Sequence, residues 1–444
     1  MSEPEPSTLI PGIVPDGRRT PLWPVVLATV LTGIGFAALK FVLIGEIALR
    51  FDPATHEPLM FQWLEDVVQR ANVLGTLRDA ITQGLAAVLT LGVLLGYLIN
   101  APLAGAWRVA PLFVISSAGV AIGAVLTMWF NPWVLALFVG TSYGTACAAR
   151  GKAVPLLAAA SGRSGTRISG MMNAALVVSL LGGTVFGIML SEFVASETWR
   201  HLTLFAFLVV AAGLGFLVNP PEPPVIPFSV GMRDIVFGTV QLVRERWPLI
   251  VAGGIAWGVA SAAVLAAFID AIDRMHMSPE VAVILVIFPA VGAIVGNLAS
   301  HWMSRRRQMI GCLWALAVLI GCYQMLAWNM ASAGIALTIM GGLFAAPTNV
   351  LDARLLTYAA SQGNPGRGAT VMSLTHNIFI LAIGGGMAIP LFLALMKPEG
   401  QFYCLAGASF VAGLVVIKAQ LHEKHAVCTV VGTQALAQSG AKAS

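Results

Sequence analysis

The chain has 444 residues, of which 58% are hydrophobic and only 10% are charged, and its formal net charge at pH 7 is +5. A soluble globular protein carries roughly 25% charged residues, so this composition excludes a water-soluble enzyme. Apolar runs of about 20 residues, long enough to cross a bilayer as a helix, recur from residue 23 almost to residue 418. We therefore expect an all-α integral membrane protein.

The positive charge does not indicate a nucleic-acid-binding protein. The basic residues occupy short loops between apolar runs and are not interleaved with aromatic residues in a polar segment. The five cysteines show no CxxC spacing, and the sequence contains no phosphate loop, HExxH or GxSxG motif. We expect no metal site, no cofactor and no enzymatic activity.

The apolar runs predict twelve transmembrane helices. They lie near residues 23–48, 80–99, 110–130, 132–150, 168–191, 201–218, 248–270, 279–300, 308–328, 332–351, 369–396 and 401–419. A proline-rich break, Pro220–Pro224, separates the first six from the last six. The predicted layout is a tail at 1–22, a six-helix bundle at 23–218, a linker at 219–247, a second six-helix bundle at 248–419 and a tail at 420–444.

The loop charges predict the orientation. Of the 25 Lys and Arg residues, 18 fall in the tails, the linker and the loops on the same side, and 6 fall in the opposite loops. Because Lys and Arg favour the cytoplasmic side, we expect both termini to be cytoplasmic. The long outer segment 51–78 predicts either an amphipathic helix on the outer interface or an ordered loop.

An internal repeat relates the two halves. A shift of 204 positions superposes Arg150 on Arg354, Gly162 on Gly366, Arg163 on Arg367, Thr166 on Thr370, Ser169 on Ser373, Asn173 on Asn377 and Gly182 on Gly386. Shared hydrophobicity alone does not account for polar identities at one offset. A parallel six-plus-six repeat is the arrangement of the major facilitator fold, in which the substrate cavity lies between the halves. We therefore expect that fold.

Arg150 and Arg354 end the fourth and tenth predicted spans at the cytoplasmic edge. One interpretation is that they are positive anchors with stems lying along the lipid. The other is that their guanidinium groups face the central cavity and bind a phosphate or carboxylate through paired hydrogen bonds. Their equivalence in the repeat favours the second interpretation. Asp352 can simply neutralise Arg354.

Four more polar residues lie inside predicted spans and complete the candidate substrate site. Lys40 is in the first span, where a charge is costly unless it faces a polar cavity, a partner or the interface. His376 and Asn377 are in the eleventh span, and Asn173 is the repeat partner of Asn377. Interhelical hydrogen bonds can explain such residues without a ligand, but the charge of histidine changes within the physiological pH range.

Carboxylates are scarce within the predicted spans. Glu46 and Asp270 lie near outer ends, and neither is central. A proton-coupled carrier usually keeps Asp or Glu residues along its pathway. We therefore expect weak coupling to the proton gradient, or none.

The repeated segments resemble the bacterial lysophospholipid transporter family. Residues 148–157, Ala-Ala-Arg-Gly-Lys-Ala-Val-Pro-Leu-Leu, resemble that family's Pro-Ala-Lys-Tyr-Gly-Ile-Leu-Pro-Glu-Leu, and Gly170-Met-Met-Asn173 follows where the family has Asn-Gly. Residues 342–351, Gly-Leu-Phe-Ala-Ala-Pro-Thr-Asn-Val-Leu, are similar to Gly-Phe-Phe-Val-Val-Pro-Leu-Asn-Ala-Leu. Val371, Leu374 and Asn377 match Val-Gln-Asn-Leu-Gly-Glu-Asn, although His376 replaces the glutamate.

The resemblance implies an inner-membrane major facilitator transporter that moves lysophospholipid, chiefly lysophosphatidylethanolamine, between leaflets by alternating access, and Arg150 stands where that family has a lysine. A carrier or efflux protein for another small anionic or amphiphilic solute is the first alternative. A membrane scaffold that does not transport is the second. The expected partners are this substrate and the lipid bilayer, and we expect a monomer.

The predicted topology can be tested with single cysteines. Residues Ser229 and Thr55 lie in segments assigned to opposite faces. Cysteines placed there, in a chain free of other cysteines, should react with a membrane-impermeant maleimide from opposite sides of the membrane. Labelling of both from the outside would overturn the predicted orientation.

Overall fold

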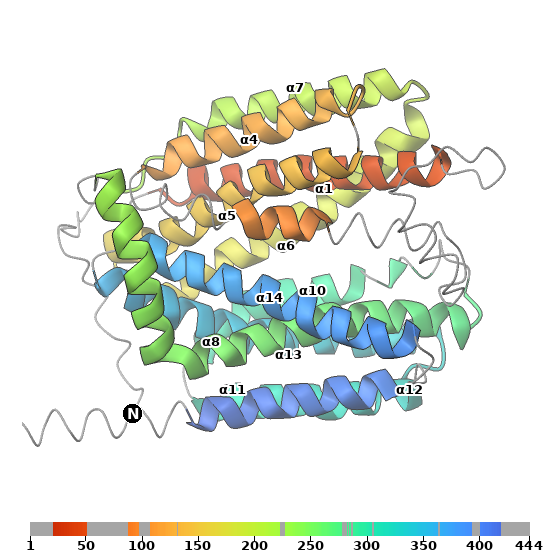
Figure 1. The fold of residues 1–444 in the computed structure, drawn as a ribbon. Helices are drawn as coiled ribbons and strands as arrows, with labels where there is room; N and C mark the ends of the chain where they lie inside the picture. Colours follow the sequence, from red (N-terminus) through yellow and green to blue (C-terminus); the bar gives the residue numbers. More distant parts are fainter. Residues whose placement is uncertain are drawn as a thin grey trace, which may run out of the picture.

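The computed structural model describes residues 21–50, 88–96, 107–130, 132–222, 227–277, 282, 284–285, 287–303, 306–362, 365–392 and 400–418 (Figure 1). Within these ranges all regular secondary structure is helical. The outer segment 51–78, the tail up to residue 20 and the tail 420–444 lie outside the described residues.

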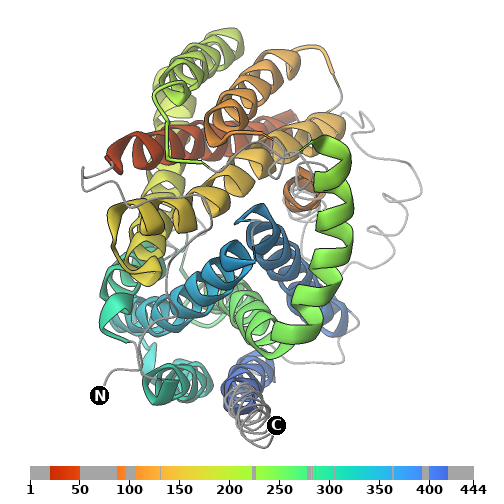
Figure 2. The same cartoon turned by 90° about the vertical axis from the view of Figure 1, so that its left-hand side faces the viewer.

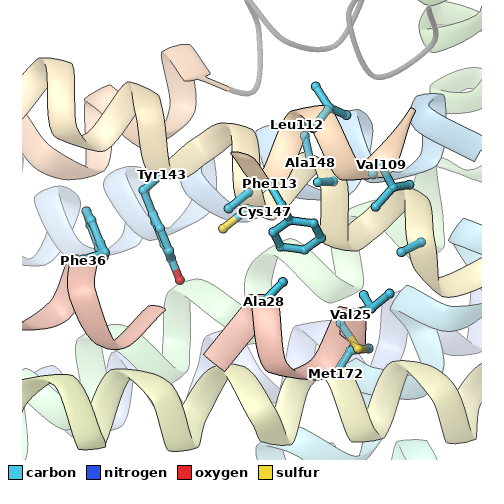
Figure 3. Close-up of a cluster of buried hydrophobic side chains, with 14 of the residues drawn as sticks. Val25, Ala28, Phe36, Val109, Leu112, Phe113, Tyr143, Cys147, Ala148 and Met172 are labelled. Atoms are coloured by element: carbon cyan, nitrogen blue, oxygen red, sulfur yellow. The ribbon is translucent and has the colours of Figure 1, made fainter. Parts of the chain in front are cut away.

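The helices of the first half form one group. They are α1 (Trp23–Arg50), a helix at 88–96, α4 (Val109–Leu126), α5 (Pro132–Ser161), α6 (Gly165–Phe193) and α7 (Glu197–Gly215). Helix α1 packs against α6 and α7, and α4 packs against α5 and α7. Figure 3 shows part of their shared core, where the Phe36 ring stacks on the Tyr143 ring with centroids 3.9 Å apart. A hydrogen bond of 2.7 Å between the buried Thr32 and Ser117 hydroxyls also joins α1 to α4.

The helices of the second half form another group, with its own apolar core. They are α8 (Phe228–Asp273), α10 (Ile287–Ala299), the short 3₁₀ helix η1 (Ser300–Trp302), α11 (Arg306–Gly321), α12 (Tyr323–Leu326), α13 (Met330–Ser361), α14 (Pro365–Phe392) and Gly400–Lys418. Helix α13 packs against α8, α10, α11 and α14, so it is central to this group.

The outer faces of both groups are apolar. Phe193, Val318 and Ile335 are 81%, 67% and 63% exposed. Seven of the described helices are long and apolar enough to cross a membrane. Large apolar side chains on the outside of apolar helices are what a bilayer requires, because lipid cannot satisfy polar groups. The structure therefore supports a multi-pass membrane protein, and the count of twelve spans in two six-helix bundles stays a prediction.

Two helices extend well beyond their predicted spans. Helix α5 continues to Ser161 rather than to residue 150, and α13 continues to Ser361 rather than to residue 351. Hydropathy ended both spans at the first charged residues, Arg150 and Asp352. The backbone remains helical there because these charges are buried within the protein, at 8% and 4% exposure.

The predicted linker is partly helical. Helix α8 begins at Phe228 and kinks at Arg246, where φ is −123° and ψ is 17°. Pro248 explains this break, because proline in a helix interior removes a hydrogen bond and clashes with the preceding turn. Figure 1 shows that the segment before the kink runs across the ends of other helices, and Figure 2 shows it along one edge, reaching from the first half to the second.

Polar contacts join the segment of α8 before the kink to the end of α13. Another contact joins the first half to Glu222. The Tyr358 hydroxyl donates to Glu245 at 2.6 Å, and the Arg246 guanidinium lies 3.9 Å from the Tyr358 ring centroid. Lys152 pairs with Glu222 at 3.0 Å. We call the side that carries these contacts and the α5–α6 loop the linker side. It is the side predicted to be cytoplasmic.

Glycines allow the helix at 88–96 to touch the α5 backbone. A Cβ atom added at Gly144 would lie 2.5 Å from the Val93 carbonyl oxygen and 3.0 Å from Gly96 Cα, and one added at Gly140 would lie 3.0 Å from Gly92 Cα. Such small-residue contacts are a main source of helix association in membranes, where no hydrophobic force holds helices together.

Substitution of Gly144 by valine should therefore destabilise the first half. Overpacking of a close contact costs about 1 to 3 kcal/mol, so we expect a lower thermal unfolding midpoint in detergent, followed by tryptophan fluorescence. Gly213→Val is the matched control, because Gly213 is exposed and has no atom within 4 Å of the added Cβ. Equal effects of the two substitutions would contradict this packing.

Candidate functional site

The boundary between the halves is formed by the repeated helices. Helix α5 packs against α14, and its repeat counterpart α13 packs against α6 and also touches α5. The closest approaches occur at Gly151, which faces Ala369, and at Gly170, which faces the Asn297 carbonyl oxygen. Gly165 faces the Thr357 hydroxyl. These contacts all lie on the linker side, so the halves are closed against each other there.

Asn349 of α13 is the polar centre of this closed boundary. Its side chain is fully buried. Its Nδ2 donates to the Thr166 carbonyl oxygen at 3.0 Å and to Ser300 Oγ at 2.5 Å, and its Oδ1 accepts from Asn173 Nδ2 at 3.0 Å. One amide therefore connects α6 of the first half to α13 and η1 of the second. Asn173 was predicted as a substrate-binding residue, and the structure places it in this helix-to-helix contact.

The other predicted site residues are distributed over the membrane domain. Arg150 is buried in α5, directly before Gly151 at the boundary, and Arg354 is half-buried in α13. Lys40 is half-buried in α1, and Asn377 is half-buried in α14. The structure thus keeps the two arginines at equivalent places toward the linker side. No contact described above gathers all six predicted residues into one cluster.

His376 is paired with a carboxylate that was not predicted as its partner. Its Nε2 lies 3.2 Å from Asp352 Oδ1, and their side chains are 11% and 5% exposed. The pair joins α14 to α13, the two helices of the second half that also contact α5. It lies next to Gly253 of α8, since a Cβ atom there would be 3.5 Å from His376 Nε2 and 3.8 Å from Asp352 Oδ1.

Two aromatic rings pack beside the His376–Asp352 pair. The Trp257 ring of α8 lies with its centroid 5.2 Å from that of the His376 imidazole, at an interplanar angle of 31°. Phe344 of α13 meets Trp257 edge to face at 5.1 Å. A cation on the imidazole would be stabilised by the indole face and by the Asp352 carboxylate. The arrangement is therefore a polar point with apolar walls.

The sequence suggested that Asp352 neutralises Arg354, and the structure also pairs Asp352 with His376 of the neighbouring helix. The sequence reasoning on carboxylates within the spans considered only Glu46 and Asp270, near outer ends. Asp352 lies one residue beyond the tenth predicted span and is buried within α13, which continues to Ser361. Sequence reasoning missed Asp352, Trp257 and Asn349 as parts of the site. The sequence features that could have indicated them are the polarity of Asn349 and Asp352, in the fourth helix of the second half, and the size of Trp257, in its first helix.

Metal binding is not indicated in the part of the chain that the structure describes, where no group of three or more His, Cys, Asp or Glu side chains could hold an ion.

Comparison with known proteins identifies the fold. No protein-family model matches the sequence, and a search of curated proteins finds no relative. Among solved structures, the human organic anion transporter MFSD10 (TETRAN) superposes with a TM-score of 0.68 at 16% identity, covering 91% of this chain and 100% of that one. The fold is that of the major facilitator transporters. The transporter FucP in its outward conformation has a TM-score of 0.57 at 15% identity, with coverages of 90% and 98%.

A bacterial homologue of the iron transporter ferroportin, in an outward-facing state, is similar to the same degree. Its TM-score is 0.57 at 13% identity, and the match covers 90% of this chain and 99% of that one. Identities this low show a shared fold. They say nothing about whether the cargo is shared.

Removal of the Asn349 amide should open the linker side. Two of its three hydrogen bonds, those with Thr166 and Asn173 of α6, cross the boundary. At roughly 0.6 kcal/mol each in a membrane protein they total about 1.2 kcal/mol, or about 8-fold in the closed-to-open ratio. The measurement is the maleimide labelling rate of a cysteine placed at Thr357, which faces Gly165 across the boundary. We expect Asn349→Ala to raise this rate by about that factor.

The control is Thr348→Ala, because Thr348 is equally buried but donates only within its own helix, to Phe344 and Ala345 carbonyl oxygens. If Asn349→Ala labels no faster than Thr348→Ala, the amide does not hold the halves together.

Proposed function

We propose that this protein is a secondary transporter that carries an amphiphile with a phosphate group across the inner membrane by alternating access. The observation that carries the proposal is the burial of Arg150 at the boundary between the halves. Arg150 is 8% exposed, and the next residue packs directly on Ala369 of the other half. A guanidinium in this position suits a phosphate or carboxylate, which needs a charge-assisted partner once it leaves water.

The proposed cargo is a lysophospholipid, with lysophosphatidylethanolamine as the first candidate. The resemblance of residues 148–157 to the lysophospholipid transporters supports a phosphate-bearing amphiphile. The half-buried Arg354, at the repeat-equivalent place on α13, adds a second cationic group. The apolar outer faces would let an acyl chain stay in or near the lipid. We propose a monomer with both termini in the cytoplasm.

A small organic anion is the alternative cargo. The similar human protein is an organic anion transporter, and a site with several cationic groups and aromatic walls fits such a molecule equally well in chemical terms. A scaffold without transport is the remaining alternative, and it would tolerate loss of the buried charges.

Uptake by spheroplasts separates these functions. The variants are Arg150→Gln and Arg150→Lys, with Arg233→Gln as the control because Arg233 is exposed on the linker segment of α8. Labelled lysophosphatidylethanolamine is supplied at matched protein levels, and lysophosphatidylglycerol and naphthoate compete for uptake. A bidentate contact is worth about 1.5 to 3 kcal/mol, so Arg150→Gln should weaken uptake by about 10- to 150-fold.

Arg150→Lys should be milder than Arg150→Gln, because lysine keeps the charge but loses the planar fork. Arg233→Gln should transport like the wild type. If naphthoate is carried and lysolipids neither compete nor enter, the cargo is a small anion. If the wild type moves none of the three, the transport proposal fails.

A further inference from the structure

The His376–Asp352 pair is an addition to the second half that the fold itself does not need. The 204-residue shift places Ala148 at the position of Asp352 and Met172 at the position of His376. Both counterparts are buried apolar side chains, at 0% and 1% exposure. Helices α5 and α6 therefore pack at this place without charge, whereas α13 and α14 bring an acid and a base together.

A buried ion pair of this kind is weak evidence for stability. Desolvation of two charges often exceeds their attraction, and apolar side chains of similar volume stabilise as well or better. Ionisable residues within membrane segments are costly and typically belong to ion or proton pathways. The apolar counterparts Ala148 and Met172 in the first half show that the same helix arrangement packs without such a pair. Function, rather than folding, explains its presence.

The His376–Asp352 pair also lies between helices that meet the other half, so a change in its charge can alter how these helices pack. It connects α13 to α14, both of which contact α5 across the boundary. On its other side, Trp257 of α8 covers the imidazole, and Gly253 lets the α8 backbone approach. The pair therefore contacts three helices, α8, α13 and α14, so the protonation of His376 would change contacts with all three.

We propose that the His376–Asp352 pair is the proton-binding site of this protein and couples cargo movement to the proton gradient. With Nε2–H donating to Asp352, Nδ1 takes one proton from water on one side of the membrane and releases it to the other side after the conformational change. The pair then alternates between a net charge of −1 and zero. Loading the proton removes a negative charge near the path of an anion, so proton and anion travel in the same direction.

The other charged groups near these helices have fixed partners or lie toward helix ends. On the linker side they are Arg150 and Lys152 on α5, Arg167 on α6, Arg244, Glu245 and Arg246 on α8, Arg354 on α13, Arg367 on α14, His301 on η1, and Arg306 and Arg307 on α11. Glu192 and Asp270 lie toward the opposite ends of α6 and α8. Among the acids, Glu245 accepts from Tyr358 at 2.6 Å and Asp270 pairs with Arg274 at 2.6 Å.

Proton binding can be tested without any cargo. In detergent, the difference between wild-type and Trp257→Phe emission isolates the fluorescence of Trp257, which an imidazolium ion in ring contact should quench. We expect this signal to change in one step between about pH 5 and 8, the range in which histidine titrates. The step should vanish in His376→Gln and persist in His301→Gln, a matched control because His301 also contacts a tryptophan, Trp302, at 4.5 Å.

Coupling is tested in proteoliposomes with a pH dye inside, using lysophosphatidylglycerol and naphthoate as probes. One proton per anion lets a gradient of one pH unit drive about tenfold accumulation. The coupling of proton movement to cargo movement rests on the proposed function, whereas proton binding alone does not. Exchange of labelled for unlabelled cargo by the wild type, which needs no gradient, reports transport alone. His376→Gln should lose both proton uptake and gradient-driven accumulation, whereas His301→Gln should keep both.

The outcomes distinguish the two proposals. No cargo exchange by the wild type, together with a Trp257 step, would defeat the proposed function and leave the proton site standing. A wild type without a Trp257 step, or a His376→Gln variant that still takes up protons with its cargo, would overturn the proton site. Asp352→Asn checks the pair independently, and it should lose gradient-driven accumulation as His376→Gln does, because the imidazole loses its carboxylate partner.

Discussion

A polar group inside a bilayer must find its partner within the protein, and this constraint organises the whole molecule. Lipid offers no hydrogen bonds, so the outer faces are apolar, with Phe193 and Val318 largely exposed. Polar side chains such as Asn349 and Asp352 are instead buried on helices at the boundary between the halves. In the part of the chain that the structure describes, the boundary therefore carries polar groups that a cargo could reach if the halves separate, as the proposed alternating access requires.

The two halves share a frame but differ in chemistry along that boundary. Helices α5 and α13 are repeat counterparts, and so are α6 and α14, and each pair contributes to the cross-half contacts. The shift of 204 residues relates Asn349 to Thr145, Asp352 to Ala148 and His376 to Met172. At these three positions the first half has Thr, Ala and Met, whereas the second half has Asn, Asp and His. The repeat supplies two similar helical frames, and the differences between them place the His376–Asp352 pair in the second half.

Much of the helical frame could be predicted from sequence, because the bilayer demands long apolar segments and the repeat revealed which helices correspond. The site was harder for physical reasons. Asp352 ended a predicted span, since hydropathy treats a charge as a boundary even when another helix satisfies it. His376 lies 24 positions further along the chain, beyond the reach of any periodicity within one helix, and Trp257 comes from a third helix. Only the fold brings these three side chains together.

The energies at the boundary are matched to what a cargo can provide. The two hydrogen bonds of Asn349 that cross the boundary total about 1.2 kcal/mol at roughly 0.6 kcal/mol each. Binding of an anion by a buried guanidinium such as that of Arg150 is worth about 1.5 to 3 kcal/mol. A ligand shifts a conformational equilibrium only by its difference in affinity for the two states. If the anion contacts Arg150 in only one state, the two quantities are comparable. The hydrogen bonds that Asn349 makes across the boundary are therefore of a size that the binding of a single cargo molecule can offset.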